Sequence, residues 1–199
     1  AVDDWKHLGL EADAAAILLA RVDSPGAASD AEAETVRAAF EAAGATWSAR
    51  SEDAQEAEAL FAARRLAYPA LERLGPVLTE DVCVPIGAVP SMLATIEDVA
   101  LRHDVHIANL AHAGDGNLHP LLITPPGDDA ARTRAQAAFE EIHSAAIALG
   151  GTVTGEHGIG LLKRGGLVAE AESAVIAMHH AIRAALDPAG ILNPGKVVA

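Results

Sequence analysis

Apolar residues recur along this chain with two different periods, and these periods predict a mixture of helices and strands. A spacing of three or four positions is typical of helices. It predicts helices over residues 29–43, 52–74, 89–103, 128–149 and 166–186. The first of these opens on Ser29–Glu32 (SDAE), which has the form of a capping box. The second contains Pro69, near which we expect a bend or a break.

Shorter runs rich in leucine and β-branched residues predict strands. They cover residues 14–23, 46–51, 77–85, 105–112 and 118–124. The last two flank a glycine-rich turn and form the one tight strand pair, a hairpin. No dinucleotide-binding fingerprint accompanies the alternation of strands and helices. We therefore expect an α+β fold, an antiparallel sheet with helices on one face, rather than a doubly wound parallel sheet.

Composition narrows the classes of partner and the cellular location. The formal net charge of −14 argues against nucleic acid or an anionic membrane surface as a partner. No apolar run is long enough to span a membrane. The single cysteine, Cys83, excludes an internal disulfide and fits a reducing cytoplasm, where we expect the protein to be located. The chain does not begin with methionine, and we expect residues 1–199 to be one domain of a longer protein.

The hairpin turn carries the first candidate chemistry, in the sequence HAGDGNLHP at residues 112–120. A turn centred on residues 114–117 would place His112 opposite His119. Directly opposed residues have Cβ atoms roughly 4.5–5.5 Å apart, which suits two imidazoles that bind one metal ion. The alternative is that the two histidines cap a polar loop, and the hairpin alone does not decide between these readings.

The second candidate segment is GGTVTGEHGIG at residues 150–160, which we expect to be a loop. Neighbouring side chains in an extended segment point in opposite directions. Glu156, being anionic, is then the natural third metal ligand, and His157 is the natural proton acceptor on another side of the same cavity. Three protein ligands would leave coordination positions open, as a catalytic metal requires.

Together with DPAGILNPGK at residues 187–196, these segments resemble the signature sequences of a known family. LFAARRLAYPAL and TEDVCVPIGAVPSML fit the segments that precede them. The family is the C-terminal domain of FAD-linked oxidases, in the glycolate oxidase and D-lactate dehydrogenase branch of the vanillyl-alcohol oxidase superfamily. The resemblance implies a ferredoxin-like substrate cap, with an FAD-binding domain that lies upstream of this chain.

The resemblance also implies roles for individual residues. The expected metal ligands are His112, His119 and Glu156, the base is His157, the anchor for the substrate carboxylate is Arg64, and the residue that reaches back to the FAD is Asn193. The mixed ligand set suits zinc, with iron or manganese as open alternatives.

Arg64 can also be judged from its own helix. It shares one helix face with Phe61, Arg65 and Tyr68, and the forked guanidinium suits a carboxylate. A solvated arginine pair on an acidic surface is the alternative, and Arg65 is the second choice for the anchor.

The implied function is oxidation of a small D-2-hydroxy acid of the lactate or glycolate type to the 2-oxo acid. Leu121 and Thr79 stand where some relatives carry polar residues, which weakens the case for a dicarboxylic substrate. The chain alone should be inactive and free of flavin. A non-catalytic metal-binding or subunit-interaction module and a metal-dependent hydrolase remain alternatives. Homo-oligomerisation and a protein that accepts electrons stay open as partners.

Overall fold

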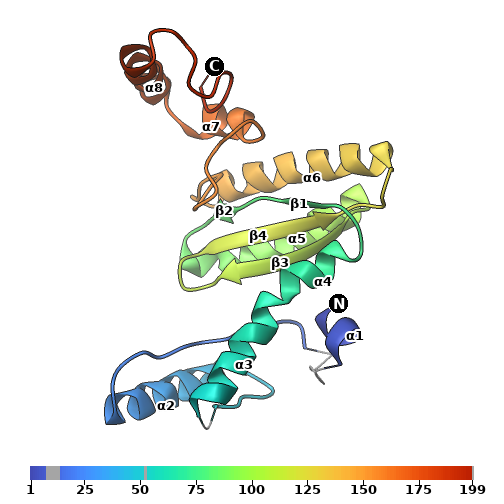
Figure 1. Ribbon diagram of the computed structural model, residues 1–199, viewed down its shortest axis with the longest axis vertical. Coiled ribbons are helices and arrows are strands. Elements are labelled where there is room, and N and C mark those ends of the chain that lie inside the picture. Colours follow the sequence, from blue (N-terminus) through green and yellow to red (C-terminus); the bar gives the residue numbers. More distant parts are fainter. Residues whose placement is uncertain (8–13, 52, 199) are drawn as a thin grey trace. The chain divides into compact units, whose positions relative to one another are not determined.

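The computed structural model describes residues 1–7, 14–51 and 53–198 and divides the chain into two compact units. Unit 1, Ala1–Arg73, is helical in its regular parts (Figure 1). Its helices are α1 (Val2–Lys6), α2 (Ala27–Ala42), α3 (Ala54–Arg65) and α4 (Ala67–Glu72).

The two strands predicted in unit 1 are not formed. Residues 14–23 and 46–51 have no regular secondary structure, and Ile17 and Leu18 are 64% and 61% exposed. A strand requires a neighbour that pairs with its backbone groups. No described segment pairs with these two, so their apolar composition gave a wrong prediction.

The two helices predicted in unit 1 are present, with different boundaries. Helix α2 begins at Ala27 after the N-cap Gly26, so the predicted capping box is wrong. Glu32 instead accepts a hydrogen bond from Ser24 Oγ at 2.6 Å. The helix predicted over residues 52–74, of which residue 52 lies outside the described residues, is broken at Leu66 into α3 and α4, which confirms the break expected near Pro69. In a continuous helix the ring of Pro69 would clash with the carbonyl of Arg65, four residues earlier, and the break next to Arg65 avoids this clash.

Unit 2, Leu74–Ala199, contains an antiparallel sheet and the remaining helices. Strand β4 (Asn117–Ile123) pairs with β3 (His106–His112) and with both β1 (Val77–Thr79) and β2 (Val82–Cys83). The helical elements are η1 (Ile86–Ala88), α5 (Val89–His103), α6 (Asp129–Ala148), α7 (Arg164–Glu170) and α8 (Ser173–Leu186).

The strand predicted at residues 77–85 is split opposite Pro120. Both halves pair with β4 in one continuous register, from Val77 opposite Ile123 to Cys83 opposite Asn117. On the side of β4 that faces β1 and β2, Thr124 N donates a hydrogen bond to Pro76 O. Every second residue of β4 counted from Thr124, Pro120 among them, therefore directs its backbone groups toward β1 and β2. Because proline has no N–H, the ladder loses a bond here, and Asp81 lies within the resulting gap.

The core lies between the sheet and helices α5 and α6. Leu118 and Leu122 of β4 belong to the same buried cluster as Met92 and Ile96 of α5 and Phe139 of α6. Odd-numbered β4 residues, including His119, point to the opposite face because side chains alternate along a strand. Helices α5 and α6 therefore cover one face, and the α+β prediction is confirmed.

The order of elements also agrees with the ferredoxin-like prediction. A strand, α5, the β3–β4 hairpin and α6 follow one another, and a final strand is reduced to a single antiparallel bridge between Thr152 and Cys83. The predicted last helix is broken into α7 and α8 at Ala171, whose backbone is extended. The preceding Glu170 is held by Thr152 Oγ1 and Val153 N at 2.9 Å, and this tertiary contact overrides the helical periodicity.

Across the described parts of the chain, no helix combines the length and the apolar character that crossing a membrane would need.

Candidate metal and substrate site

The β3–β4 hairpin closes one residue earlier than the sequence analysis predicted. His112 lies opposite Asn117, and His119 lies opposite Leu110, so the predicted pairing of the two histidines is wrong. The turn covers residues 113–116, and Gly116 takes a positive φ of 72°. A Cβ on Gly116 would lie 2.0 Å from the carbonyl oxygen of Val84, so only glycine fits this close approach.

The two histidines nevertheless share one face of the sheet. His112 and His119 are now diagonal neighbours, a relation in which side chains still meet. Their ring centroids are 5.4 Å apart in an edge-to-face arrangement. His112 is half exposed, whereas His119 is buried. The predicted register is wrong, but the two histidines still lie close together. The register differs by two residues, and such a shift leaves each side chain on the same face of the sheet.

The loop that follows α6 brings Glu156 and His157 to the same place. Glu156 Oε1 lies 3.3 Å from His119 Nε2 and 3.8 Å from His112 Nε2. His157 Nε2 lies 3.8 Å from the same oxygen, and its ring centroid is 5.0 Å from that of His119. The expectation that Glu156 and His157 point in opposite directions is wrong, because this loop curls rather than extends.

The loop curls around Asp81, a fully buried carboxylate that the sequence analysis did not assign to the site. Asp81 Oδ2 accepts hydrogen bonds from the backbone N–H groups of Gly155 and Glu156 at 2.6 Å, and of His157 at 3.2 Å. Its other oxygen forms an ion pair with buried Lys163. A polar Glu80–Asp81 pair inside the apolar run VLTEDVCVP is the sequence signal that could have revealed this.

The charges of these groups depend on their surroundings. Burial opposes ionisation of Asp81, but the bonds from Lys163 and from the N–H groups of Glu156 and His157 outweigh it and hold its pKa well below the usual range. Burial lowers the pKa of His119, and the nearby His157 ring lowers it further, while Glu156 acts in the opposite sense. A neutral imidazole is the form that binds a metal.

The donor set of His112, His119 and Glu156 brings two imidazoles and a carboxylate close enough together to be candidate ligands of a single divalent cation. Two ligands that each lie about 2.0–2.1 Å from one ion cannot be more than about 4.2 Å apart. The distances of 3.3 and 3.8 Å from Glu156 to the two imidazoles meet this condition. All three donor atoms lie within 4.8 Å of one another, and they combine nitrogen and oxygen donors.

A second group of candidate ligands, Glu80, Asp81 and His157, does not fit a metal in the same way. The ammonium of Lys163 already lies between its carboxylates, 3.2 Å from Glu80 and in direct contact with Asp81. This cluster therefore already has its cation, supplied by the protein.

The two other residues predicted for the site lie elsewhere in the chain. Arg64 is exposed on α3 of unit 1, and its neighbour Arg65 donates to Glu58 at 2.5 Å. Asn193 lies in the C-terminal tail with a positive φ of 45°, and its side-chain oxygen accepts from Lys196 Nζ at 3.2 Å. Their roles toward substrate and FAD stay predictions.

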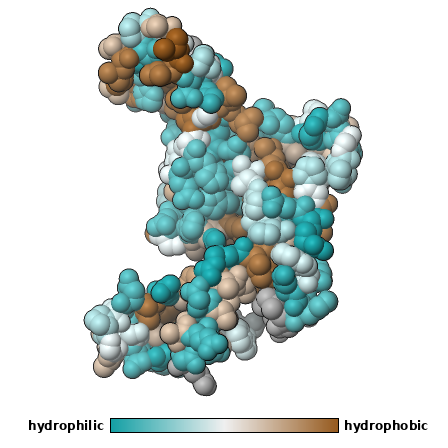
Figure 2. All heavy atoms as spheres, in the orientation of Figure 1, coloured by the Kyte–Doolittle hydropathy of each residue, from teal (hydrophilic) through white to brown (hydrophobic). Residues whose placement is uncertain are grey.

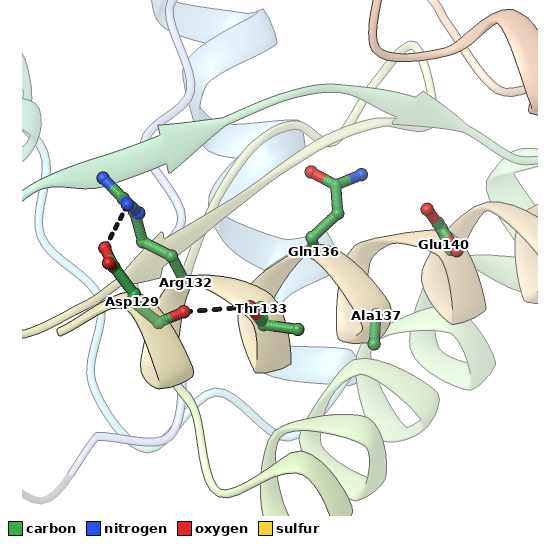
Figure 3. Close-up of a pocket in the computed structure, with 6 residues that line it drawn as sticks. All are labelled: Asp129, Arg132, Thr133, Gln136, Ala137 and Glu140. Carbon is green, nitrogen blue, oxygen red and sulfur yellow. Dashed lines mark hydrogen bonds and ion pairs between the residues drawn. The ribbon is translucent and has the colours of Figure 1, made fainter.

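A shallow depression along α6 is a poor alternative site (Figure 3). The residues that line it come from one exposed helix surface, and its charged pair, Asp129 and Arg132, bond to each other. Thr133 donates to the carbonyl of Asp129 at 2.9 Å. Such a surface is typical of a solvated helix face.

Residues 1–197 match the protein family described as FAD linked oxidases, C-terminal domain. The chain therefore belongs to this family, as the sequence motifs indicated. It is similar to the glycolate oxidase subunit GlcD of Bacillus subtilis (39% identity over all of this chain and 42% of that protein). The same subunit of Escherichia coli K12 is 36% identical over 98% of this chain and 40% of that protein.

A probable mitochondrial D-lactate dehydrogenase of Danio rerio is 35% identical over 74% of this chain and 30% of that protein. The chain thus spans about two fifths of the length of the bacterial relatives.

Proposed function

We propose that this chain is the metal- and substrate-binding part of an FAD-dependent dehydrogenase that oxidises a small D-2-hydroxy acid of the lactate or glycolate type. The observation that carries the proposal is the convergence of His112, His119 and Glu156, with His157 beside them. Two relatives, a glycolate oxidase subunit and a probable D-lactate dehydrogenase, support this substrate class.

The chain's own residues divide the work between binding and proton transfer. His112, His119 and Glu156 would hold a divalent cation, for which zinc suits the ligand set and iron or manganese are alternatives. When bound, that cation would make the substrate hydroxyl more acidic, and FAD held by an upstream domain would accept the hydride. His112 and Glu156 are about half exposed, which leaves a small acid access to them.

His157 would take the hydroxyl proton. Its Nδ1 faces Asp81 Oδ1 at 3.6 Å, and its Nε2 lies on the side of Glu156 and the candidate ligands. A proton on Nδ1, beside the carboxylate, leaves Nε2 free to accept one. Arg64 would bind the substrate carboxylate, because its planar guanidinium matches a carboxylate with two parallel hydrogen bonds.

The test compares His157→Ala with His119→Ala in this chain joined to its FAD-binding portion. We expect His157→Ala to lower the rate of D-lactate or glycolate oxidation by about 10²–10⁴-fold with unchanged metal content. His119→Ala should lose both metal and activity. His180→Ala, on exposed α8, is the matched control and should change neither. If His157→Ala removes the metal while Glu156→Ala keeps it, ligand and base are assigned the wrong way round.

A further inference from the structure

The ion pair between Asp81 and Lys163 is unusual because both side chains are fully buried. Lys163 Nζ also donates to the backbone carbonyl of Asp81 at 2.6 Å. The attraction within a buried ion pair often only just offsets the cost of removing two charges from water. Stability alone is therefore a weak explanation for this pair, and its role is better sought in the groups that the carboxylate holds.

The carboxylate of Asp81 holds the backbone from which two candidate site residues project. Three successive N–H groups, at residues 155–157, donate to one oxygen of Asp81, and Thr154 Oγ1 donates to the other at 3.0 Å. These bonds fix the directions in which the side chains of Glu156 and His157 leave the loop. The loop is rich in glycine and lacks regular structure, so it depends on such an external anchor.

The close packing of Gly155 shows how closely this anchored loop approaches the hairpin. A Cβ at position 155 would lie 2.6 Å from the Asn117 side chain. Asn117 lies opposite His112, so the loop rests against the residue that pairs with one of the candidate ligands. The anchor thus sets the distance between the two halves of the site.

Lys163 stabilises the ionised form of the Asp81 carboxylate, and holding the loop requires that form. A carboxylate can accept hydrogen bonds on all its lone pairs only while it is ionised, and burial disfavours the ionised form. The ammonium group in contact with it compensates. We propose that Asp81 and Lys163 are a positioning pair that orients Glu156 and His157 toward His119, a role that rests on the metal site proposed above.

The test uses the paired variant Asp81→Leu/Lys163→Met of the 199-residue chain, with Glu80→Gln added because the largely buried Glu80 carboxylate, 3.2 Å from Lys163, would otherwise lose its partner. Because apolar replacements of buried ion pairs are often neutral for stability, we expect this variant to stay folded. Exchange of the amide hydrogens of Glu156 and His157 should become at least about 10-fold faster. Affinity for Zn²⁺, titrated calorimetrically, should fall by about 10–100-fold, as for other losses of groups that orient metal ligands.

A matched control is Glu170→Gln, because Glu170 binds the same loop at Thr152 and Val153 without contacting Asp81. It should leave Zn²⁺ affinity unchanged. Asp81→Asn provides a second test if the paired variant does not fold, and the same faster exchange and weaker Zn²⁺ binding are expected. A folded variant at Asp81 that binds Zn²⁺ as tightly as the parent would overturn the proposal.

A metal-free measurement separates this proposal from the proposed function. The rings of His119 and His157 are close enough to give a nuclear Overhauser effect in the parent chain. If the parent binds no Zn²⁺, the proposed metal site is wrong. The positioning role is then judged by this effect, which a folded variant should lose. A variant that keeps it shows that Asp81 and Lys163 do not position His157.

Discussion

Helices α6 and α8 lie in the same unit and both carry apolar residues at helical spacing, but their apolar side chains have different surroundings. Helix α6 buries Ala135, Phe139 and Ile142 against α5 and the sheet. On α8 none of the described residues is buried, and an apolar stripe faces solvent (Figure 2). The stripe consists of Val175, Met178, Ile182 and Leu186, spaced three or four positions apart.

The difference shows what periodicity can and cannot predict. Regular spacing reveals that one side of a helix is apolar. Whether that side is buried depends on which other elements of the fold pack against it, and the spacing alone does not reveal this. For α6, helix α5 and the sheet supply the cover, and the helix becomes part of the core. The stability of this chain should therefore depend strongly on α6 and weakly on α8.

The largest effect is expected for Ile142→Ala in α6. Ile142 is fully buried, so the substitution removes apolar contacts and leaves a cavity. We expect it to lower the free energy of unfolding by about 2–5 kcal/mol. Urea unfolding followed by circular dichroism measures this quantity. A loss no larger than that of the equivalent substitution on α8 would contradict the comparison.

The buried face of α6 should also make stability depend on pH through His143. Burial, assisted by the charge of Lys163, lowers the pKa of His143 to about 4 from 6.5. As pH falls below 6.5 the unfolded chain takes up a proton that the folded chain refuses until about pH 4. Stability present at neutral pH is thus lost on acidification, by about 2 kcal/mol between pH 6.5 and 5.

Measurements of unfolding at several pH values test this dependence against His143→Leu. That variant cannot take up the proton, so its stability should fall less steeply over this range. His180→Gln, on an exposed part of α8, is the control and should follow the parent curve. Parallel curves for the parent and His143→Leu would show that His143 is not the group responsible.

The smallest effect is expected for Ile182→Ala, the counterpart of Ile142→Ala. Ile182 is 51% exposed, so its truncation removes few contacts within this chain. The free energy of unfolding should change by no more than about 0.5 kcal/mol. The same urea titration measures it, and a loss above about 2 kcal/mol would mean that α8 is packed like α6.

The sequence predicted the elements with strong local signals. Helices α5 and α6 were predicted within a residue or two, because their apolar spacing and their ends are encoded locally. The hairpin was predicted from its glycine-rich turn, but its register was displaced because the position of the turn was judged without the packing of Gly116 against Val84. The strand predicted over residues 14–23 does not form, because a strand-like composition does not provide a partner strand.

Only part of the candidate site was predicted, again because local patterns are visible in the sequence and contacts between distant segments are not. His112, His119 and Glu156 lie in distinctive motifs, and the structure brings them together. Asp81 lies in TEDVCVPIGAVPSML and Lys163 just after GGTVTGEHGIG, but neither segment signals that these two residues pair across 82 positions of the sequence. A buried ion pair between distant segments depends on the completed fold, which local patterns do not describe.

The anchoring of the loop by Asp81 has a consequence for the order of folding. The carboxylate that holds Gly155 lies 74 positions earlier in the chain, and it is placed only when β1 and β2 have paired with β4. Closing so long a segment costs entropy that the sheet must offset before the loop can gain anything from its bonds. We therefore expect the scaffold to form first and the ligand-bearing loop to acquire its final shape in a late step of folding.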